Sequence, residues 1–364
     1  MDSPDGLRPF IMKVGRGEKL ARPLEEEEAY QAMKLILEGG CSEFQIGAFL
    51  AAMRIKSETP EETSGFIRAV KEAAPKIHPR VKSLLDFGDP YDGKTKSLNL
   101  SPLTAVILAA AGCPVILHGD HGIPAKKGVG AGAVFEALGA ALDLEPQAVE
   151  RSVEELGIAY IHASFFLTRF EELKPLRLQY GLRSSLNVIE KMWNPADAPY
   201  LAVGIYHAPY FESTSRALLK TPVRKGLVVQ GLEGFAELRL HRPTKYVEVS
   251  GGQAVEKFAV PADFGFSRGG NWEMTDGMDT KAHARVTRKV LEGEKGAVRD
   301  GALFNAGVKL FWNEHASSVE EGMEKAREAL DSGGALAKLE AFVKFTRNSI
   351  SRGTARPGPA SHYG

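Results

Sequence analysis

Residues 86–105, DFGDPYDGKTKSLNLSPLTA, lead from a strand pattern into a helix pattern through a loop that contains glycine and aspartate. The apolar run 83–87 has the length of a buried strand, and Ser101 and Pro102 are the expected N-cap and first residue of the helix. In an open α/β sheet, ligands bind at the carboxyl ends of the strands, where free N–H groups of a helix N-terminus favour anions. The loop is therefore a candidate anion site, although a plain strand–helix turn would show the same pattern.

A second strand–loop–helix transition follows in residues 112–139, GCPVILHGDHGIPAKKGVGAGAVFEALG. His118 and His121 flank Asp120, a combination of metal-binding residue types, but the spacing fits no strong metal-ligand signature. A glycine-rich loop is more typical of a backbone that passes close to a ligand or to another segment.

The same alternation continues along the chain. Further expected strands are 114–118, 159–162, 201–205, 226–230, 236–240 and 246–249, and expected helices are 102–111, 131–142, 165–180 and, in several pieces, 280–343. Strands that alternate with helices in this way predict βαβ units. The predicted fold class is α/β plus helical, a small α-helical domain packed on a larger α/β domain with a mostly parallel central sheet.

The N-terminal part of the chain has a helical pattern throughout. Acidic residues 25–28 suit the first turn of one helix, and Ser42 and Pro60 are signals for the start of the next two. The predicted divisions are a helical domain over 1–75 with helices from about 166–195 packing on it, an α/β domain over 76–165 and 196–346, and a disordered tail over 347–364.

Composition excludes some classes of protein. The 364 residues are 43% hydrophobic and 25% charged, which is ordinary for a globular protein, and there is no apolar run of about 18 residues that would cross a membrane. The N-terminus has no apolar signal-peptide core, so we expect a cytoplasmic protein. Cys41 and Cys113, the only cysteines, are expected to be buried hydrophobes. The formal net charge of zero argues mildly against nucleic-acid binding, but a neutral total can include a basic face.

Several segments, taken in their order, resemble anthranilate phosphoribosyltransferases over about residues 21–343. They are EFQIGAFLAAMRIK at 43–56, Asp92-Gly93 with Asn99-Leu-Ser101, His118-Gly119, FEALG at 135–139, LRLQYGLRSSLN at 176–187, Asn194-Pro195, LEGEKG at 291–296, Asp300 and Asn305-Ala306. The resemblance implies a helical domain packed on an α/β domain, with phosphoribosyl diphosphate and Mg²⁺ bound at the hinge. It also implies a homodimer formed through the helical domain.

The resemblance also implies which residues form the site. On the donor and phosphate side they are Gly88, Asp92, Gly93, Asn99, Ser101, His118, Gly119, Lys126 and Lys127. On the acceptor side they are Asp120, Leu167 and Arg177. Glu237 matches one magnesium ligand, while Ala236 replaces the partner carboxylate.

The sequence departs from the family at the diphosphate loop. The family's Gly-Thr-Gly-Gly-Asp-Gly is replaced by Gly88-Asp-Pro-Tyr-Asp-Gly93. Pro90 has no N–H to donate, Tyr91 adds bulk, and Asp89 is expected to add negative charge where a polyanion would bind. At about 4 Å and an effective dielectric constant of about 20, such a repulsion is of order 4 kcal/mol.

Other family motifs change as well. The basic residue before His118 and the Asn and Arg after Gly119 are lost, and the His-Pro pair of the acceptor side is replaced by Leu167-Thr168. Together with the turn at 91–93 and the segment VGRGEKLARPL at 14–24, this pattern is similar to a branch of paralogues without the anthranilate activity. At least some members of that branch are dimers that bind nucleic acid along a basic groove.

Three functions remain open from the sequence. The first is binding of a phosphate-rich ligand, a phosphorylated small molecule or single-stranded nucleic acid, with candidate contacts Arg16, Lys19, Arg22, Lys94, Lys96, Lys126, Lys127, Arg347, Arg352 and Arg356. The second is a Mg²⁺-dependent phosphoribosyl or glycosyl transferase that uses phosphoribosyl diphosphate with anthranilate or another acceptor. The third is a homodimer that serves only as a partner-binding scaffold.

Overall fold

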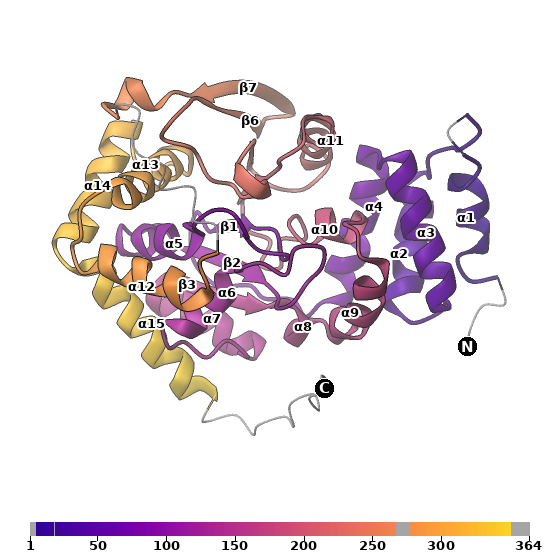
Figure 1. Cartoon of the computed structure of the whole chain (residues 1–364), viewed down its shortest axis with the longest axis horizontal. Helices are drawn as coiled ribbons and strands as arrows, with labels where there is room; N and C mark the ends of the chain where they lie inside the picture. The colour runs from indigo at the N-terminus through magenta and orange to yellow at the C-terminus, as the bar shows by residue number, and fades with distance from the viewer. Residues whose placement is uncertain (1–4, 18, 267–276, 351–364) are drawn as a thin grey trace.

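The helical domain lies at one end of the molecule. The structure is a computed structural model that describes residues 5–17, 19–266 and 277–350. Four helices form this end, coloured indigo in Figure 1: α1 (Arg8–Val14), α2 (Glu26–Leu37), α3 (Glu43–Lys56) and α4 (Pro60–Ala73). Ser42 caps α3 by accepting a hydrogen bond from the Gln45 amide, and Pro60 is the first residue of α4, as the sequence predicted.

A seven-stranded sheet forms the centre of the α/β domain. Its order is β3-β2-β1-β4-β5-β6-β7, with β1 to β5 parallel and β6 and β7 antiparallel. The strands are β1 (Leu85–Gly88), β2 (Val115–Gly119), β3 (Ile158–His162), β4 (Tyr200–Gly204), β5 (Lys225–Val229), β6 (Thr244–Ser250) and β7 (Gln253–Ala259). The predicted fold class is therefore confirmed. From β1 the chain continues to β2 and β3 on one side of the sheet, and from β4 it continues to β5 on the other side. The boundary between β1 and β4 is therefore a topological switch point.

Helices cover both faces of the sheet. They are α5 (Ser101–Ala110), α6 (Ala131–Ala137), α7 (Pro146–Leu156), α11 (Ala208–Leu218), α12 (Thr280–Leu291), α13 (Ala297–Trp312), α14 (Val319–Asp331) and α15 (Gly334–Ile350), with short 3₁₀ turns η1 (Leu232–Gly234) and η2 (Pro261–Phe264). Each face of the sheet has its own hydrophobic core. In β2, Val115 and Leu117 belong to the core that includes α5 and α13, whereas Ile116 belongs to the core that includes the helical domain. No helix within the described residues is long and apolar enough to cross a membrane.

Three helices after β3 bring the chain back to the helical domain. They are α8 (Ala163–Phe166), α9 (Thr168–Tyr180) and α10 (Ser185–Ile189), of which α9 packs on α3 and α10 packs on α3 and α4 (Figure 1). Arg169 on α9 donates a hydrogen bond of 2.8 Å to the carbonyl of Ile36. The chain therefore crosses the boundary between the domains more than once.

Some sequence-based expectations about local structure are wrong. Residues 236–240 do not form a strand, because Asn305 of α13 bonds both the N–H and the C=O of Leu238, at 2.8 and 3.0 Å. The structure has a strand that the sequence did not predict, β7. Its side chains are largely exposed, so it lacks the alternation of buried apolar residues by which a strand is recognised.

Helix boundaries also differ from the predictions. Helix α5 begins at Ser101 with Leu100 as its N-cap, so Ser101 is not the cap. Helix α6 ends at Ala137 rather than at 142. In the predicted disordered tail, 347–350 complete α15, and the rest, including Arg352 and Arg356, lies outside the described residues. Cys113 is buried as expected, whereas Cys41 is only partly buried.

Candidate functional site

A cavity of about 540 Å³ lies where the two domains meet at the carboxyl ends of β1 and β4. We call it the interdomain cleft. Its lining residues include Arg54 and Glu58 from the end of α3, Pro90, Asp92 and Ala125 from the β1–α5 and β2–α6 loops, Leu182, Arg183, Ser184, Asn187, Val188 and Lys191 from the α9–α10 region, and Ile205, Tyr206, His207, Tyr210 and Gly234. The strand order therefore brings the loop that the sequence singled out to the wall of a cavity.

Basic groups of the cleft differ in how available they are. Arg183 makes two hydrogen bonds of 2.8 and 2.9 Å to the buried carboxylate of Asp92, which ties the α9–α10 loop to the β1–α5 loop. Arg54 is exposed and donates to the carbonyl of Arg183 at 2.5 Å. Burial, with a further contribution from Arg183, lowers the pKa of Lys191 to about 7. The two arginines are thus the firmly charged cations of the cleft.

A shallower hollow of about 440 Å³ adjoins the cleft and shares Tyr206 with it. We call it the Tyr206 groove. Its walls include Arg242, Lys245 and the exposed ring of Phe258. Tyr206 is half exposed, with its ring centroid 4.9 Å from that of His207. Exposed aromatic rings and cations therefore continue from the cleft onto the neighbouring surface.

The altered part of the diphosphate loop is folded inward. Tyr91 is buried, and its hydroxyl lies 2.7 Å from Nδ1 of His118 and accepts a hydrogen bond of 3.0 Å from the Trp193 indole. The other ring nitrogen of His118 lies 2.9 Å from a carboxylate oxygen of Asp86. Tyr91 therefore fills space beneath the loop, and of the altered residues 89–91 only Pro90 lines the cleft.

Asp89 is also directed into the interior, so the expectation that its charge faces a bound polyanion is wrong. It is 4% exposed, and neither carboxylate oxygen accepts a hydrogen bond. Burial raises the pKa of Asp89 to about 7, opposed by the Ser101 hydroxyl, and Glu237 raises it further. A carboxyl group in these surroundings favours its neutral form.

Glu237 forms a buried ion pair with Lys94. One carboxylate oxygen of Glu237 contacts the ammonium of Lys94, and the other accepts a hydrogen bond of 2.9 Å from the Leu100 amide. The two side chains are 1% and 6% exposed. Lys94 also donates to the carbonyl of Leu98 at 2.9 Å, and its ammonium lies 4.7 Å from the centre of the Phe235 ring. Lys94 is therefore not a surface contact, contrary to the expectation from the sequence.

Asp120 lies in a second polar network, with side chains of β3, α8 and α9. Its carboxylate accepts hydrogen bonds from Ser164 and His162 and lies 2.6 Å from the ammonium of Lys174. Burial alone would lower the pKa of His162, but the carboxylates of Asp120 and Asp143 raise it to about 9. Among the described residues, no group of three or more His, Cys, Asp and Glu side chains is arranged to hold a metal ion.

Arg177 and Leu167, the other acceptor-side candidates, are buried away from the cleft lining. Arg177 makes a two-pronged ion pair with buried Glu190, with distances of 2.6 and 3.1 Å. Leu167 is the N-cap residue of α9 and is 8% exposed. Of the twelve donor- and acceptor-side candidates, the structure brings only Asp92 to the cleft lining.

The remaining donor-side candidates shape the backbone around the loop. A Cβ on Gly88 would lie 1.9 Å from the carbonyl oxygen of Lys191, so only glycine fits there. Gly93 has φ +69°, a left-handed conformation, and a Cβ there would meet Gly128. Asn99 donates to the carbonyl of Val129 at 3.1 Å. Ser101 is the first residue of α5 and lies near Glu237, and Gly119 lies against the Tyr160 hydroxyl. Lys126 donates hydrogen bonds to the Gly93 carbonyl and to Glu233. Lys127 is exposed and has φ +52°.

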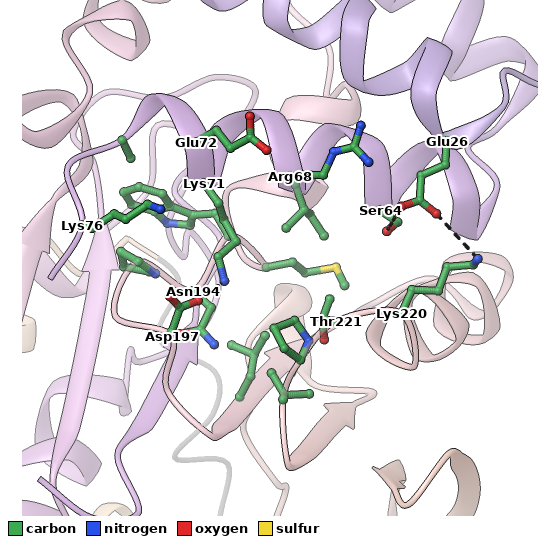
Figure 2. Close-up of a pocket in the computed structure, with 18 of the residues that line it drawn as sticks. Glu26, Ser64, Arg68, Lys71, Glu72, Lys76, Asn194, Asp197, Lys220 and Thr221 are labelled. Atoms are coloured by element: carbon green, nitrogen blue, oxygen red, sulfur yellow. Dashed lines mark hydrogen bonds and ion pairs between the residues drawn. The ribbon is translucent and has the colours of Figure 1, made fainter. Parts of the chain in front are cut away.

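A second cavity, of about 360 Å³, lies between α4 and the segments before β4 and β5 (Figure 2). Several charges at its rim are paired across the domain boundary. Lys220, after α11, reaches Glu26 of α2 at 3.7 Å, and Lys71 of α4 contacts Asp197. These pairs join the two domains at the end of β4 opposite to the cleft.

Two family models match the chain. The one described as the helical bundle domain of a glycosyl transferase family covers residues 8–74, and the one described as the a/b domain of that family covers 92–336. The chain therefore belongs to this glycosyl transferase family, in which a helical bundle accompanies an α/β domain.

The similar proteins define the family more closely. Anthranilate phosphoribosyltransferase of Acetivibrio thermocellus is 33% identical over 95% of this chain and 98% of its own length, and that of Rubrobacter xylanophilus is 35% identical over 95% and 99%. The crystal structure of the Thermus thermophilus enzyme has a TM-score of 0.82 at 32% identity, covering 94% and 99%. The anthranilate phosphoribosyltransferase family expected from the sequence is confirmed.

A more distant structure has the same fold. Anthranilate phosphoribosyltransferase from Saccharomyces cerevisiae, in complex with PRPP and Mg, has a TM-score of 0.80 at 20% identity, covering 95% of this chain and 99% of its own. At this identity the likeness concerns the fold alone.

The sequence reasoning missed several residues that the structure brings to the cleft or its edge: Arg54, Arg183, Tyr206 and Glu233. Arg54 and Arg183 lie in the segments 43–56 and 176–187 that carried the resemblance, so their proximity to the site had a signal in the sequence. Tyr206 and Glu233 follow β4 and β5, and only the strand order places the ends of those strands near the β1–α5 loop.

Proposed function

We propose that this chain binds a phosphate-bearing ligand, single-stranded nucleic acid, in the interdomain cleft and the Tyr206 groove. We further propose that it does so without magnesium and does not make phosphoribosyl-anthranilate. The observation that carries the proposal is the buried ion pair between Lys94 and Glu237.

Residues at the metal position do not fit Mg²⁺. Magnesium is usually bound through one or two carboxylates together with substrate phosphates. Glu237, the one retained carboxylate, is bonded to an ammonium and a backbone amide, and Ala236 offers no second carboxylate. A divalent cation would have to displace the Lys94 ammonium from a site that is almost closed to solvent. The chain thus carries its own fixed cation where the resemblance implies a metal.

Aromatic rings and arginines support a nucleic-acid ligand. Binding of single strands combines cations that follow the phosphates with rings on which bases stack. The cleft has the exposed Arg54, and Arg183 paired with Asp92, as cations for phosphates, and the half-exposed ring of Tyr206 lines both the cleft and the groove. Arg242 and Phe258 repeat the same combination farther along. A neutral total charge is compatible with this arrangement because a few cations, Arg54 and Arg183 in the cleft and Arg242 and Lys245 in the groove, are enough to form a local basic surface.

Fluorescence anisotropy of a labelled single-stranded oligonucleotide tests the ligand. We expect binding that weakens steeply between low and physiological salt, because phosphate contacts release counterions. Tyr206→Ala is expected to weaken binding by about five- to a hundred-fold, the range for one base stacked on one ring. Phe311→Ala removes a similarly exposed ring on α13 and is the matched control. Equal affinity of both variants and the unchanged protein would exclude the Tyr206 groove, and no binding at either salt would exclude nucleic acid.

The alternative function is a surviving Mg²⁺-dependent phosphoribosyl or glycosyl transferase. It is favoured by the cleft, which remains open with about 540 Å³ at the switch point, and by the names of the relatives that are 33–35% identical. Loss of anthranilate fluorescence in the presence of phosphoribosyl diphosphate and Mg²⁺ tests it directly. We expect no turnover and no Mg²⁺-dependent binding of phosphoribosyl diphosphate by calorimetry. Turnover with any acceptor would establish the alternative.

We also propose a homodimer formed through the helical domain. Large apolar side chains are exposed on α1 and α3, including Met12, Phe44 and Ile55, with Phe44 85% exposed. Light scattering during size exclusion is expected to give twice the chain mass of 39.4 kDa. Phe44→Asp is expected to give the mass of one chain, while Phe311→Asp on α13 leaves the mass unchanged. A protein of single-chain mass at micromolar concentration would rule the dimer out.

A further inference from the structure

Six hydrogen-bond donors converge on the carboxylate of Glu233. The backbone amides of Thr95, Lys96 and Ser97 donate to it at 3.0, 3.0 and 3.1 Å. The hydroxyls of Thr95 and Ser97 donate at 3.1 and 3.0 Å, and the Lys126 ammonium at 3.0 Å. Three consecutive amides that point at one anion form a concave anion-binding site in the backbone. We call these six donors the 95–97 nest.

The 95–97 nest has more donors than a carboxylate can satisfy well. Two carboxylate oxygens have about four lone-pair sites between them, whereas a phosphate monoester has three free oxygens and therefore about six. Its combination of amides, hydroxyls and one ammonium is also the set that phosphate groups favour. By donor number and type, the nest matches a phosphate better than the carboxylate that occupies it.

Glu233 is held in the nest by a strained turn and by charge. It has φ +54° and ψ +13°, a left-handed conformation that is unfavourable for a residue with a side chain. Burial alone would raise the pKa of Glu233, but the amides of Thr95 and Lys96 and the Lys126 ammonium lower it to about 2. The carboxylate is therefore ionised at neutral pH, as an anion that competes with phosphate must be.

The nest borders the interdomain cleft. Gly234, the next residue after Glu233, and Ala125, the residue before Lys126, both line the cleft. Thr95 and Lys96 are exposed, so a rotation of the Glu233 side chain alone would open the nest to solvent. Movement of the strands is not needed.

We propose that the 95–97 nest is a phosphate-binding site, that Glu233 occupies it as an internal competitor, and that the phosphate group of a ligand in the cleft displaces the carboxylate. The inference rests on the proposed function, since it needs a phosphate-bearing ligand to enter the cleft. It assigns a gating role to Glu233, which restricts the site to ligands whose phosphate competes with a covalently tethered carboxylate.

Calorimetric titration with inorganic phosphate tests the nest without any larger ligand. Glu233→Ala is expected to bind phosphate at least about ten-fold more tightly than the unchanged protein, because the competitor is removed while the donors remain. Glu233→Gly should show the same gain and keeps the turn, since glycine tolerates a positive φ. Glu155→Ala on α7 makes the same change in charge on an exposed helix surface and is expected to bind like the unchanged protein.

Lys126→Met in the Glu233→Ala background is expected to remove most of the gain in phosphate affinity. If Glu233→Ala and Glu233→Gly both fold but bind phosphate no better than the unchanged protein, Glu233 only fastens the loop and the inference fails. That result would not affect oligonucleotide binding through Tyr206 in the unchanged protein. Conversely, the variants could bind phosphate more tightly while the unchanged protein binds no oligonucleotide. That result would refute the nucleic-acid ligand and support the 95–97 nest as a phosphate-binding site.

Discussion

Replacing Lys94 by methionine is expected to lower the free energy of unfolding by about 3–5 kcal/mol, the usual cost of removing one partner from a buried ion pair. The Glu237 carboxylate would then lose its cationic partner in a site where it is 6% exposed, with the Leu100 amide as its remaining close hydrogen-bond donor. The contact of the ammonium with the Phe235 ring and its bond to the Leu98 carbonyl would be lost too. Chemical denaturation followed by tryptophan fluorescence measures the change.

Two further variants separate the ion pair from other effects of the substitution. Lys96→Met lies in the same loop but is exposed, and it is expected to change the free energy of unfolding by no more than about 0.5 kcal/mol. Glu237→Met combined with Lys94→Met is expected to recover most of the loss, because no unpaired charge remains buried. If Lys94→Met changed the free energy of unfolding as little as Lys96→Met, the Lys94 ammonium would not be a fixed partner of Glu237. The proposal that this ion pair takes the place of a metal would then fail.

Replacing Asp89 by asparagine is expected to stabilise the protein at pH 8 and to have a much smaller effect at pH 5. Burial raises the pKa of Asp89 from its usual 3.8 to about 7, so the folded state retains a proton that the unfolded state releases near pH 4. The contribution of Asp89 to stability is therefore fully present below pH 4 and is lost as the pH rises to about 7. Over that range the loss amounts to about 4 kcal/mol.

The asparagine side chain does not ionise, so the difference in the free energy of unfolding between the variant and the unchanged protein should grow with pH and level off above pH 7. The measurement is the free energy of unfolding of both proteins from pH 5 to pH 8. An equal difference at all pH values would mean that asparagine acts through shape or hydrogen bonding, and that Asp89 does not titrate in this range. A carboxyl resonance of Asp89 followed by NMR over the same pH range reports its ionisation directly.

Much of the fold, and the loop that lies on the wall of the cleft, could be predicted from the sequence. The apolar runs and the helix signals at Ser42 and Pro60 have local causes, namely burial periodicity and capping, and these act over a few residues. The position of the β1–α5 loop beside the cleft has the same kind of cause, because a loop that follows a parallel strand and leads into a helix lies at the carboxyl edge of the sheet. The wrong strand at 236–240 shows the limit: its alternation is real, but Asn305 takes the backbone bonds that a neighbouring strand would have taken.

What the sequence determined, then, is the order of elements, the family and the loop that forms the cleft wall. The conformation of the altered loop depends on contacts between distant segments: Tyr91 and Asp89 turn inward, and Lys94 contacts a carboxylate 143 residues away in the chain. Such pairings depend on which strand ends lie side by side, and the spacing of residues along the chain does not show which ends are neighbours. The same physical reason explains why Lys94 looks like a surface charge in the sequence and is a buried cation in the fold.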